Sequence, residues 1–237
     1  MSLPMHPGRP SLLILGAGGR LGSTLVATAL ERGHQVRAVI HNNDPLTEQQ
    51  RRHPALEIVR GDVHDPTSLA DAFADIDAVM ASLGSAAAPL PDVASTGART
   101  IVKLMARHRL RRVVTVTGSA TRLPDERVSV FHAAKRRRMR AGGPGLLVDG
   151  DCHLKVLAAS DLDWTTLRVP YMTRQPAMAY ELTPGAPNPG ATLPYRAAAQ
   201  AMLDVIASTR WNRAAPFAAA SDHCIDLERG DNGRVAS

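Results

Sequence analysis

The stretch from Leu12 to Asp44, LLILGAGGRLGSTLVATALERGHQVRAVIHNND, most constrains what this chain can fold into. A short apolar run ends in a cluster of glycines, an amphipathic segment follows, and a second apolar run comes after it. Gly33 stands directly after the amphipathic segment, where a glycine commonly ends a helix. The pattern therefore predicts a strand, a glycine turn, a helix and a second strand, which together open a parallel α/β sheet.

The same alternation continues along the rest of the 237 residues. Strands are predicted over 11–15, 34–40, 55–63, 77–82, 111–119, 163–170 and 215–220. Helices are predicted after the glycine turn and over 68–74, 92–107 (with Asp92 as its cap), 126–160 (interrupted at 142–145) and 195–208. This order predicts an α/β fold, a doubly wound parallel sheet of Rossmann type in one domain over 11–220, with a substrate region at about 171–220. Residues 1–10 are predicted to be a loose leader and 221–237 a tail.

The glycine turn predicts a site for the pyrophosphate of a dinucleotide. A side chain in such a turn would keep the backbone away from the phosphates, and the N–H groups that open the following helix then bind the anion. The glycines fit either a GxGxxxG or a GxxGxxG spacing. The residues predicted to contact the cofactor here are Gly16, Gly18, Gly19, Arg20, Leu21 and Gly22.

The end of the second predicted strand favours NADP over NAD. An NAD site usually has an Asp or Glu there for the ribose hydroxyls, but this chain continues with His41 and Asn42, and Asp44 belongs to a turn. Arg20 in the turn and Arg37 in the strand are nearby cations, and a guanidinium grips a phosphate where a carboxylate would repel it.

Net charge and cysteine content limit the other function classes. The chain carries a net charge of +6, but no zinc-finger spacing or RNA-binding aromatic motif accompanies its basic runs, so a solvated basic surface is expected and no nucleic acid. Two unpaired cysteines indicate a reducing compartment. There is no apolar run long enough for a membrane helix and no secretory signal, so a cytoplasmic protein is expected. No metal site is predicted, because Cys152–His153 and His223–Cys224 lack ligand spacing.

Three segments resemble the atypical short-chain dehydrogenase/reductases. GAGGRLG (16–22) is similar to their GATGxxG loop, SDLDWTTLRVPYMT (160–173) to their SGLDWTILRPP signature, and VTVTGSA (114–120) and YRAAAQAML (195–203) also match. Over residues 11–220 the chain resembles the NmrA-like and flavin-reductase (biliverdin-reductase-B)-like NAD(P)H-binding proteins. The resemblance implies that Asp62 lies against the adenine and that Val63 lines its pocket. It also implies cofactor contacts at the ends of later strands: Ser82, Leu83, Gly84, Thr117, Gly118 and Val169.

The tyrosine-dependent chemistry of the wider superfamily is missing. That branch uses Tyr-x-x-x-Lys for proton transfer, but none of the three tyrosines is followed by a lysine at that spacing, and the nearest imitation runs from Phe131 to Lys135. Ser119, Tyr171 and His153 are the remaining catalytic candidates. For each, a second interpretation stays open: Ser119 satisfies a strand end, Tyr171 lines a pocket, and His153 is a structural histidine.

These patterns predict an NADPH-dependent reductase that transfers hydride to a flavin, a quinone or a similar planar acceptor. Hydride transfer relies mainly on positioning, so it does not require the missing tyrosine. One alternative is a non-catalytic NADP sensor of NmrA type, which would bind a protein partner. A second alternative is a nucleotide-sugar epimerase or dehydratase. The sequence does not fix the oligomeric state.

Overall fold

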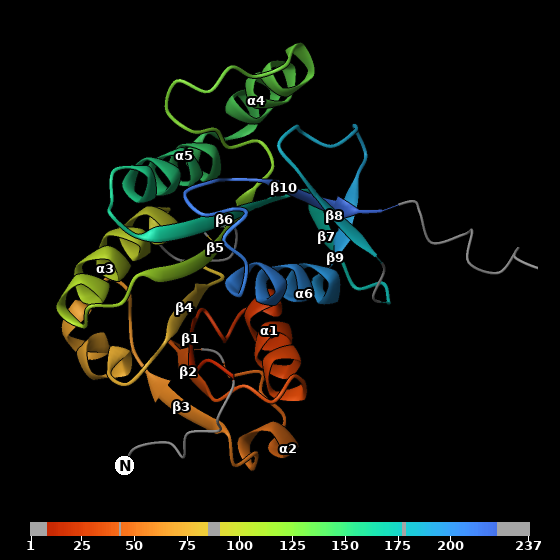
Figure 1. The fold of residues 1–237 in the computed structure, drawn as a ribbon. Coiled ribbons are helices and arrows are strands. Elements are labelled where there is room, and N and C mark those ends of the chain that lie inside the picture. Colours follow the sequence, from red (N-terminus) through yellow and green to blue (C-terminus); the bar gives the residue numbers. More distant parts are fainter. Residues whose placement is uncertain (1–8, 43, 85–90, 177–178, 222–237) are drawn as a thin grey trace, which may run out of the picture.

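Seventeen elements make up the part of the chain that the computed structural model describes, residues 9–42, 44–84, 91–176 and 179–221 (Figure 1). The helices are α1 (Arg20–Glu31), α2 (Glu48–Arg51), the 3₁₀ helix η1 (Pro66–Phe73), α3 (Val93–Arg107), α4 (Val130–Gly142), α5 (Gly145–Ala158) and α6 (Tyr195–Ile206). The strands are β1 (Leu12–Leu15), β2 (Val36–Ile40), β3 (Leu56–Arg60), β4 (Ala78–Ala81), β5 (Arg112–Gly118), β6 (Asp163–Val169), β7 (Tyr171–Thr173), β8 (Tyr180–Thr183), β9 (Thr192–Pro194) and β10 (Phe217–Ala220).

The described residues form an eight-stranded central sheet with the order β3-β2-β1-β4-β5-β6-β10-β8. Its strands pair in parallel except for β10 and β8, which are antiparallel. The order reverses between β1 and β4, which is where ligands bind in doubly wound sheets. The predicted Rossmann-type fold is therefore confirmed, and β7 with β9 adds a small parallel pair that the sequence did not predict.

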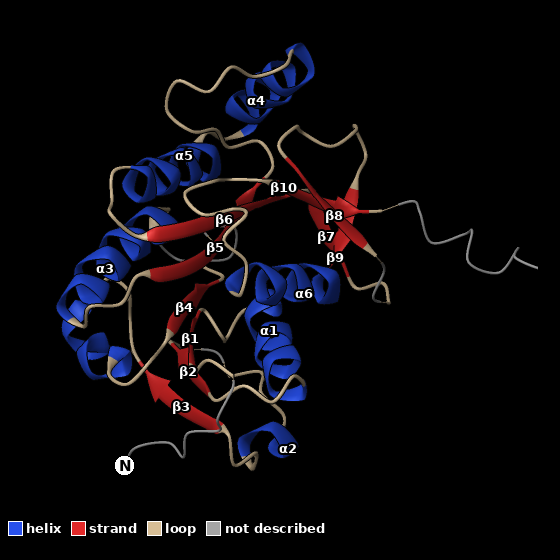
Figure 2. Ribbon diagram, in the orientation of Figure 1, coloured by secondary structure: helices blue, strands red, loops and turns tan. Residues whose placement is uncertain are grey.

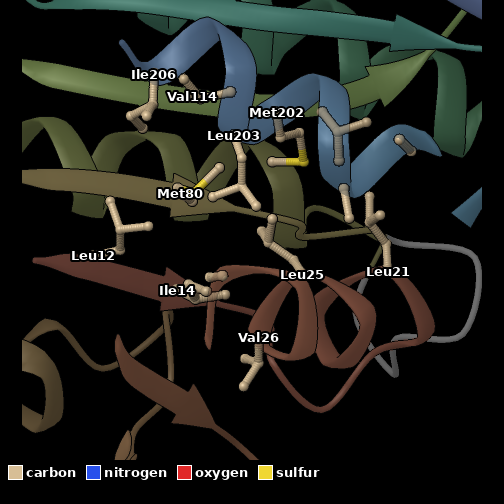
Figure 3. Packing of buried hydrophobic residues seen from close by; sticks show 14 of the residues in the cluster. Leu12, Ile14, Leu21, Leu25, Val26, Met80, Val114, Met202, Leu203 and Ile206 are labelled. Atoms are coloured by element: carbon tan, nitrogen blue, oxygen red, sulfur yellow. The ribbon is translucent and has the colours of Figure 1, made fainter. Parts of the chain in front are cut away.

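Helices cover both faces of this sheet (Figure 2). On one face α1 and α6 pack against β1 and β4, and their core includes Leu25, Met80 and Met202 (Figure 3). The other face carries η1, α3 and α5 over a second apolar cluster. Both clusters consist mostly of aliphatic side chains that are fully buried. Because β8, β10 and α6 belong to these main layers, β7 and β9 are the strands of 171–220 that stand apart from them.

The beginning of α3 is held differently from the prediction. Asp92 occupies the N-cap position, but its side chain accepts no backbone hydrogen bond there. Instead, the buried carboxylate of Asp149 in α5 accepts from the backbone N–H groups of Ala94 (3.0 Å) and Ser95 (2.8 Å). A carboxylate on a neighbouring helix thus caps α3 and fixes its first turn against α5.

Candidate cofactor site

A cleft opens at the carboxyl ends of the strands on the β1 side of the sheet, with about 580 Å³ of empty space including open solvent. This volume lies in the range of small-molecule sites. Five predicted cofactor residues line the cleft: Gly16, His41, Asp62, Val63 and Leu83. Val93 and His64, which the sequence did not single out, line it as well.

The glycine turn is packed too closely to accept side chains at two positions. A Cβ atom on Gly22 would lie 2.0 Å from the carbonyl oxygen of Gly16, and one on Gly16 would lie 2.8 Å from the carbonyl oxygen of Ser82. Gly16 also has φ = +80°, which side chains rarely adopt. No side chain caps the N-terminus of α1. The loop is thus shaped for a phosphate group against the first turn of α1.

Two side chains that the sequence predicted as cofactor contacts, Leu21 and Ser82, have structural contacts instead. The Leu21 side chain is buried in the core under α1, so only its backbone faces the turn. The Ser82 hydroxyl donates to the carbonyl oxygen of Gly16 at 3.3 Å, so it holds the loop in place. Gly19 and Arg20 are exposed at the start of α1, and Asn42 and Gly84 are exposed after β2 and β4.

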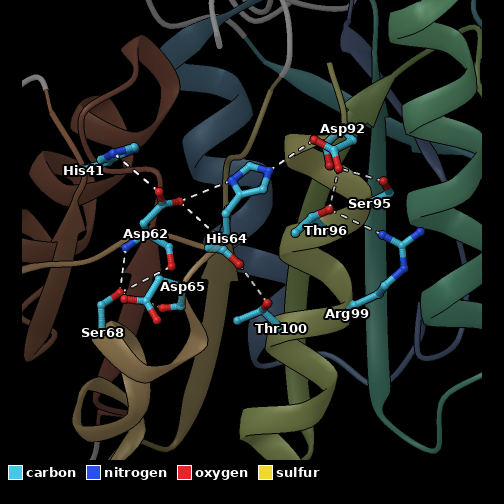
Figure 4. Close-up of polar contacts among 11 residues, drawn as sticks. His41, Asp62, His64, Asp65, Ser68, Asp92, Ser95, Thr96, Arg99 and Thr100 are labelled. Carbon is cyan, nitrogen blue, oxygen red and sulfur yellow. Dashed lines mark hydrogen bonds and ion pairs between the residues drawn. The ribbon is translucent and has the colours of Figure 1, made fainter. Parts of the chain in front are cut away.

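Histidines and aspartates form a chain of contacts that begins at the cleft wall and reaches the start of α3 (Figure 4). The His41 Nε2 atom lies 3.6 Å from Asp62, which in turn lies 3.3 Å from His64 Nδ1. On the other side, His64 Nε2 lies 3.1 Å from Asp92 at the start of α3. His64 therefore ties the loop after β3 to α3. Within the described ranges, no group of three or more His, Cys, Asp or Glu side chains is placed to hold a metal ion.

This cluster shifts the ionisation of its members. Desolvation opposes protonation of His64, but the hydrogen bonds to Asp92 and Asp62 outweigh it and raise the pKa of His64 above its ordinary value. The backbone N–H of His64 is the largest cause that lowers the pKa of Asp62. The His64 side chain likewise lowers the pKa of Asp92. These shifts favour the charged forms of His64, Asp62 and Asp92 together at mildly acidic pH.

We expect His64→Gln to destabilise the protein more at pH 5.5 than at pH 8.5. A raised folded pKa means that protonated His64 contributes its full stability below about pH 6.5, the unfolded value, and loses it as pH rises through the folded pKa. Asp62 and Asp92 have lowered folded pKa values, so their full contribution to stability is present above about pH 3.8, the unfolded value, and is lost as pH falls through the folded values. Urea unfolding at both pH values measures this difference. NMR titration of His64 with a midpoint at or below about 6.5 would contradict the assignment.

Two arginines, one in β2 and one at the end of β3, differ from the sequence prediction, which named Arg37 as a cation near the cofactor and did not single out Arg60. Arg37 is buried and donates to Glu57 (2.7 Å) and to the carbonyl oxygens of Ala72 and Ala74, so it holds η1 against the sheet and is not available to a cofactor phosphate. Arg60 at the end of β3 pairs in register with Ile40, and its guanidinium lies 3.4 Å from the carbonyl oxygen of His41. The sequence could have indicated Arg60, because it lies near the end of the third predicted strand as Ile40 ends the second, and the two ends meet at the same sheet edge.

The predicted nicotinamide side lies at the ends of β5 and β6. Gly118 pairs in register with Val169, and the Ser119 N–H donates to the carbonyl oxygen of Val169 at 2.7 Å. With strands about 4.8 Å apart, this edge lies roughly 10 Å from the glycine loop after β1. Thr117 is half-buried near the end of strand β5, and Tyr171 is 79% exposed at the start of β7. These residues share one sheet edge with the cleft.

His153 lies inside the protein, against its predicted catalytic role. Its ring nitrogens lie 2.8 Å from the Thr115 hydroxyl and 3.2 Å from the carbonyl oxygen of Ala94, and the residue is 2% exposed. Thr115 precedes Ser119 by four residues, or about 13 Å along a strand. His153 is therefore a structural histidine, the second of its two sequence interpretations.

Comparison with known proteins agrees with this geometry. Residues 16–209 match the sequence pattern of the NAD(P)H-binding family, which is most of the described domain. The chain belongs to this family. The family's cofactor fits the site, because the glycine loop is a cradle that a Cβ at Gly22 would fill.

Solved structures with the same fold include three from bacteria. A short-chain dehydrogenase/reductase of Veillonella parvula in complex with NADP has a TM-score of 0.73 at 20% identity, covering 90% of this chain and 95% of that one. An ethylated form of a short-chain dehydrogenase/reductase from the same organism gives 0.74 at 20% identity, with the same coverage. ChuY of Escherichia coli, described as an anaerobillin reductase, gives 0.72 at 17% identity, covering 90% and 98%. At these identities the likeness shows the fold alone.

The curated relatives match over a shorter stretch. A 3-beta-hydroxysteroid dehydrogenase of Mycolicibacterium neoaurum is 40% identical over 68 residues, which is 29% of this chain and 18% of that protein. A 3 beta-hydroxysteroid dehydrogenase/Delta 5-->4-isomerase of Mycobacterium tuberculosis is 37% identical over 78 residues, or 33% and 20%. The matched part is thus about a fifth of the length of these relatives. Among the helices of the described residues, none is both long and apolar enough to cross a membrane.

Proposed function

We propose that this protein is an NADPH-dependent reductase that passes hydride to a planar acceptor such as a flavin or a quinone. The observation that carries the proposal is the continuity of one sheet edge, from the glycine loop and cleft at β1 to Ser119 at the end of β5. A dinucleotide whose pyrophosphate lies at the loop spans such an edge and brings its nicotinamide toward β5. Bound NADPH supplies the hydride, and the protein's residues orient the partners.

The surroundings of that edge suit a flat, apolar acceptor. Phe131 is 77% exposed on α4, and Tyr171 is 79% exposed on β7. Exposed aromatic rings offer faces on which a flat acceptor can stack. We give Tyr171 the role of lining the acceptor site, which is the second of its two sequence interpretations.

An assay of NADPH oxidation tests the proposal. Purified protein is mixed with NADPH and, in separate samples, FMN, FAD, a series of quinones and a linear tetrapyrrole, the last because a protein of the same fold is described as an anaerobillin reductase. We expect turnover with at least one acceptor and loss of absorbance at the NADPH band. Tight NADPH binding without turnover on the whole panel would favour the NADP-sensor alternative, which the phenylalanine at position 131 supports.

We also propose that the site prefers NADP to NAD. The end of β2 offers no free carboxylate among the described residues, since Asp44 is paired with Arg51 at 2.5 Å. Exposed His41 and Arg60 lie there instead, and Arg20 is exposed at the start of α1. The two guanidinium cations and the imidazole are hydrogen-bond donors that suit a 2′-phosphate.

Arg60→Ala is expected to weaken NADPH binding about tenfold and to leave NADH binding unchanged. The lost interaction is one exposed guanidinium–phosphate contact, whose expected size is about 1.4 kcal/mol. Fluorescence titration of both cofactors measures it. Arg99→Ala on α3 is the matched control, because this exposed arginine donates, within the residues that the structure describes, to Thr96 alone. An equal loss of affinity for NADH and NADPH would show that Arg60 does not contact the 2′-phosphate.

A further inference from the structure

Lys135 on α4 stands at the lysine position of the incomplete Tyr-x-x-x-Lys pattern and makes a hydrogen bond that the sequence did not predict. Its ammonium nitrogen donates to the hydroxyl oxygen of Ser119 at 2.7 Å, across sixteen residues of chain. Ser119 is 4% exposed, whereas Lys135 is an exposed residue. The buried hydroxyl thus fixes the position of a cation that stays accessible from the sheet edge.

The helix that carries Lys135 is anchored over the end of β5. His132 and Arg136, on the same face of α4, both contact the carbonyl oxygen of Ala120, at 3.1 and 2.6 Å. Arg136 also pairs with Asp151 of α5 at 2.6 Å. These contacts hold the side chain of Lys135 beside Ser119 and leave Phe131, one turn earlier, exposed next to it.

The charges around Lys135 leave its protons available. An ammonium has three N–H donors, and one goes to Ser119. Two carboxylates from neighbouring segments are paired with arginines: Asp151 of α5 with Arg136 on α4, and Glu126, just before α4, with Arg168 of β6. In the described part of the chain, no carboxylate lies within ion-pair distance of Lys135. Partial burial lowers the pKa of Lys135, and burial likewise lowers that of His132, so the neighbouring imidazole adds no charge near neutral pH.

We infer that Lys135 is the proton donor of the reductase, held by Ser119 as its positioning residue. The inference rests on the proposed function. Reduction of the acceptor by two electrons consumes one hydride and one proton, and NADPH supplies the hydride. An N–H bond of Lys135 breaks as its proton passes to an oxygen or nitrogen of the acceptor, and the neutral amine then takes a proton from water. Phe131, which has no proton to give, stacks on the acceptor beside it.

Lys135→Arg is the sharpest variant, because it keeps the positive charge and the hydrogen-bond donors but holds its proton at any working pH. We expect kcat with the best acceptor to fall about 100-fold, the lower end of general-acid contributions. The wild-type kcat is expected to fall as pH rises through the pKa of Lys135, and this decline is expected to disappear in the variant. NADPH affinity is expected to change less than about threefold, since the positive charge remains. Lys155→Arg, an exposed lysine of α5, is the control and retains wild-type kcat.

A measurement on the cofactor-free protein tests the same inference without turnover. The chain has three lysines, Lys103, Lys135 and Lys155, so lysine labelled at Cε gives three NMR signals. The signal lost in Lys135→Arg identifies Lys135, and we expect it to titrate below the ordinary value of about 10.4 and to move in Ser119→Ala. An ordinary titration, or an active wild type whose kcat and pH profile survive Lys135→Arg, overturns the inference alone. A wild type inactive on every acceptor overturns the proposed function and the proton donor together.

Discussion

Gly22→Ala is expected to weaken NADPH binding by at least 100-fold. The added Cβ would lie 2.0 Å from the Gly16 carbonyl oxygen and 2.8 Å from the Ala17 Cα atom, both of them backbone, so the loop itself must move. Moving it removes one or two charge-assisted hydrogen bonds to the pyrophosphate, each with an energy of about 1.5–3 kcal/mol. The crowding also lowers the free energy of unfolding by about 2 kcal/mol. Calorimetric titration with NADPH and urea unfolding measure the two effects.

Gly142→Ala at the end of α4 is the matched control for this substitution. A Cβ there meets no atom within 4 Å, and alanine favours the helix over glycine. We expect unchanged NADPH affinity and equal or slightly higher stability. A Gly22→Ala protein that binds NADPH as tightly as the wild type would mean that the cofactor does not use this loop.

Asp149→Ala is expected to lower the free energy of unfolding by about 3 kcal/mol. The substitution leaves the buried N–H groups of Ala94 and Ser95 without their charged acceptor, and each such loss costs about 1–3 kcal/mol. It also frees the start of α3, where Asp92 contacts His64 and Val93 lines the cleft. NADPH affinity is therefore expected to fall as well. Urea unfolding measures the loss of stability.

Asp149→Asn tests how much of this effect comes from the negative charge of the carboxylate and how much from its oxygen as a hydrogen-bond acceptor. The amide keeps one oxygen acceptor with the same shape, so about half of the loss is expected to return. Asp71→Ala, an exposed carboxylate in η1, is expected to change stability by less than about 0.5 kcal/mol. Equal stability of Asp149→Ala and the wild type would show that the α3 terminus is held by other contacts.

Local sequence patterns predicted the α/β sheet, its helices and five of the residues that line the cleft. The glycine turn, the end of α1 at Gly33 and the alternation of strands and helices depend on backbone geometry and on apolar spacing, which the sequence displays directly. The resemblance to reductases also named Asp62, Val63 and Leu83, which line the cleft. What these predictions share is dependence on neighbouring residues or on a known motif.

The missed features depend on which side chains meet after folding. Asp149 caps a helix more than fifty residues away, and Arg37 turns inward to η1 because Glu57 and two carbonyl oxygens lie there. The bond between Lys135 and Ser119 also crosses from a helix to a strand end. A sequence pattern shows that these residues are polar and gives no partner, so the functional use of Lys135 had to come from the structure.

Calorimetric titration of the wild-type protein with NADPH and with NADH tests the central claim most directly. We propose that the pyrophosphate lies at the glycine loop and the 2′-phosphate near His41, Arg20 and Arg60. We therefore expect one site per chain, with NADPH bound at least tenfold more tightly than NADH. Binding of NADH as tight as or tighter than that of NADPH, or of neither cofactor, would contradict it.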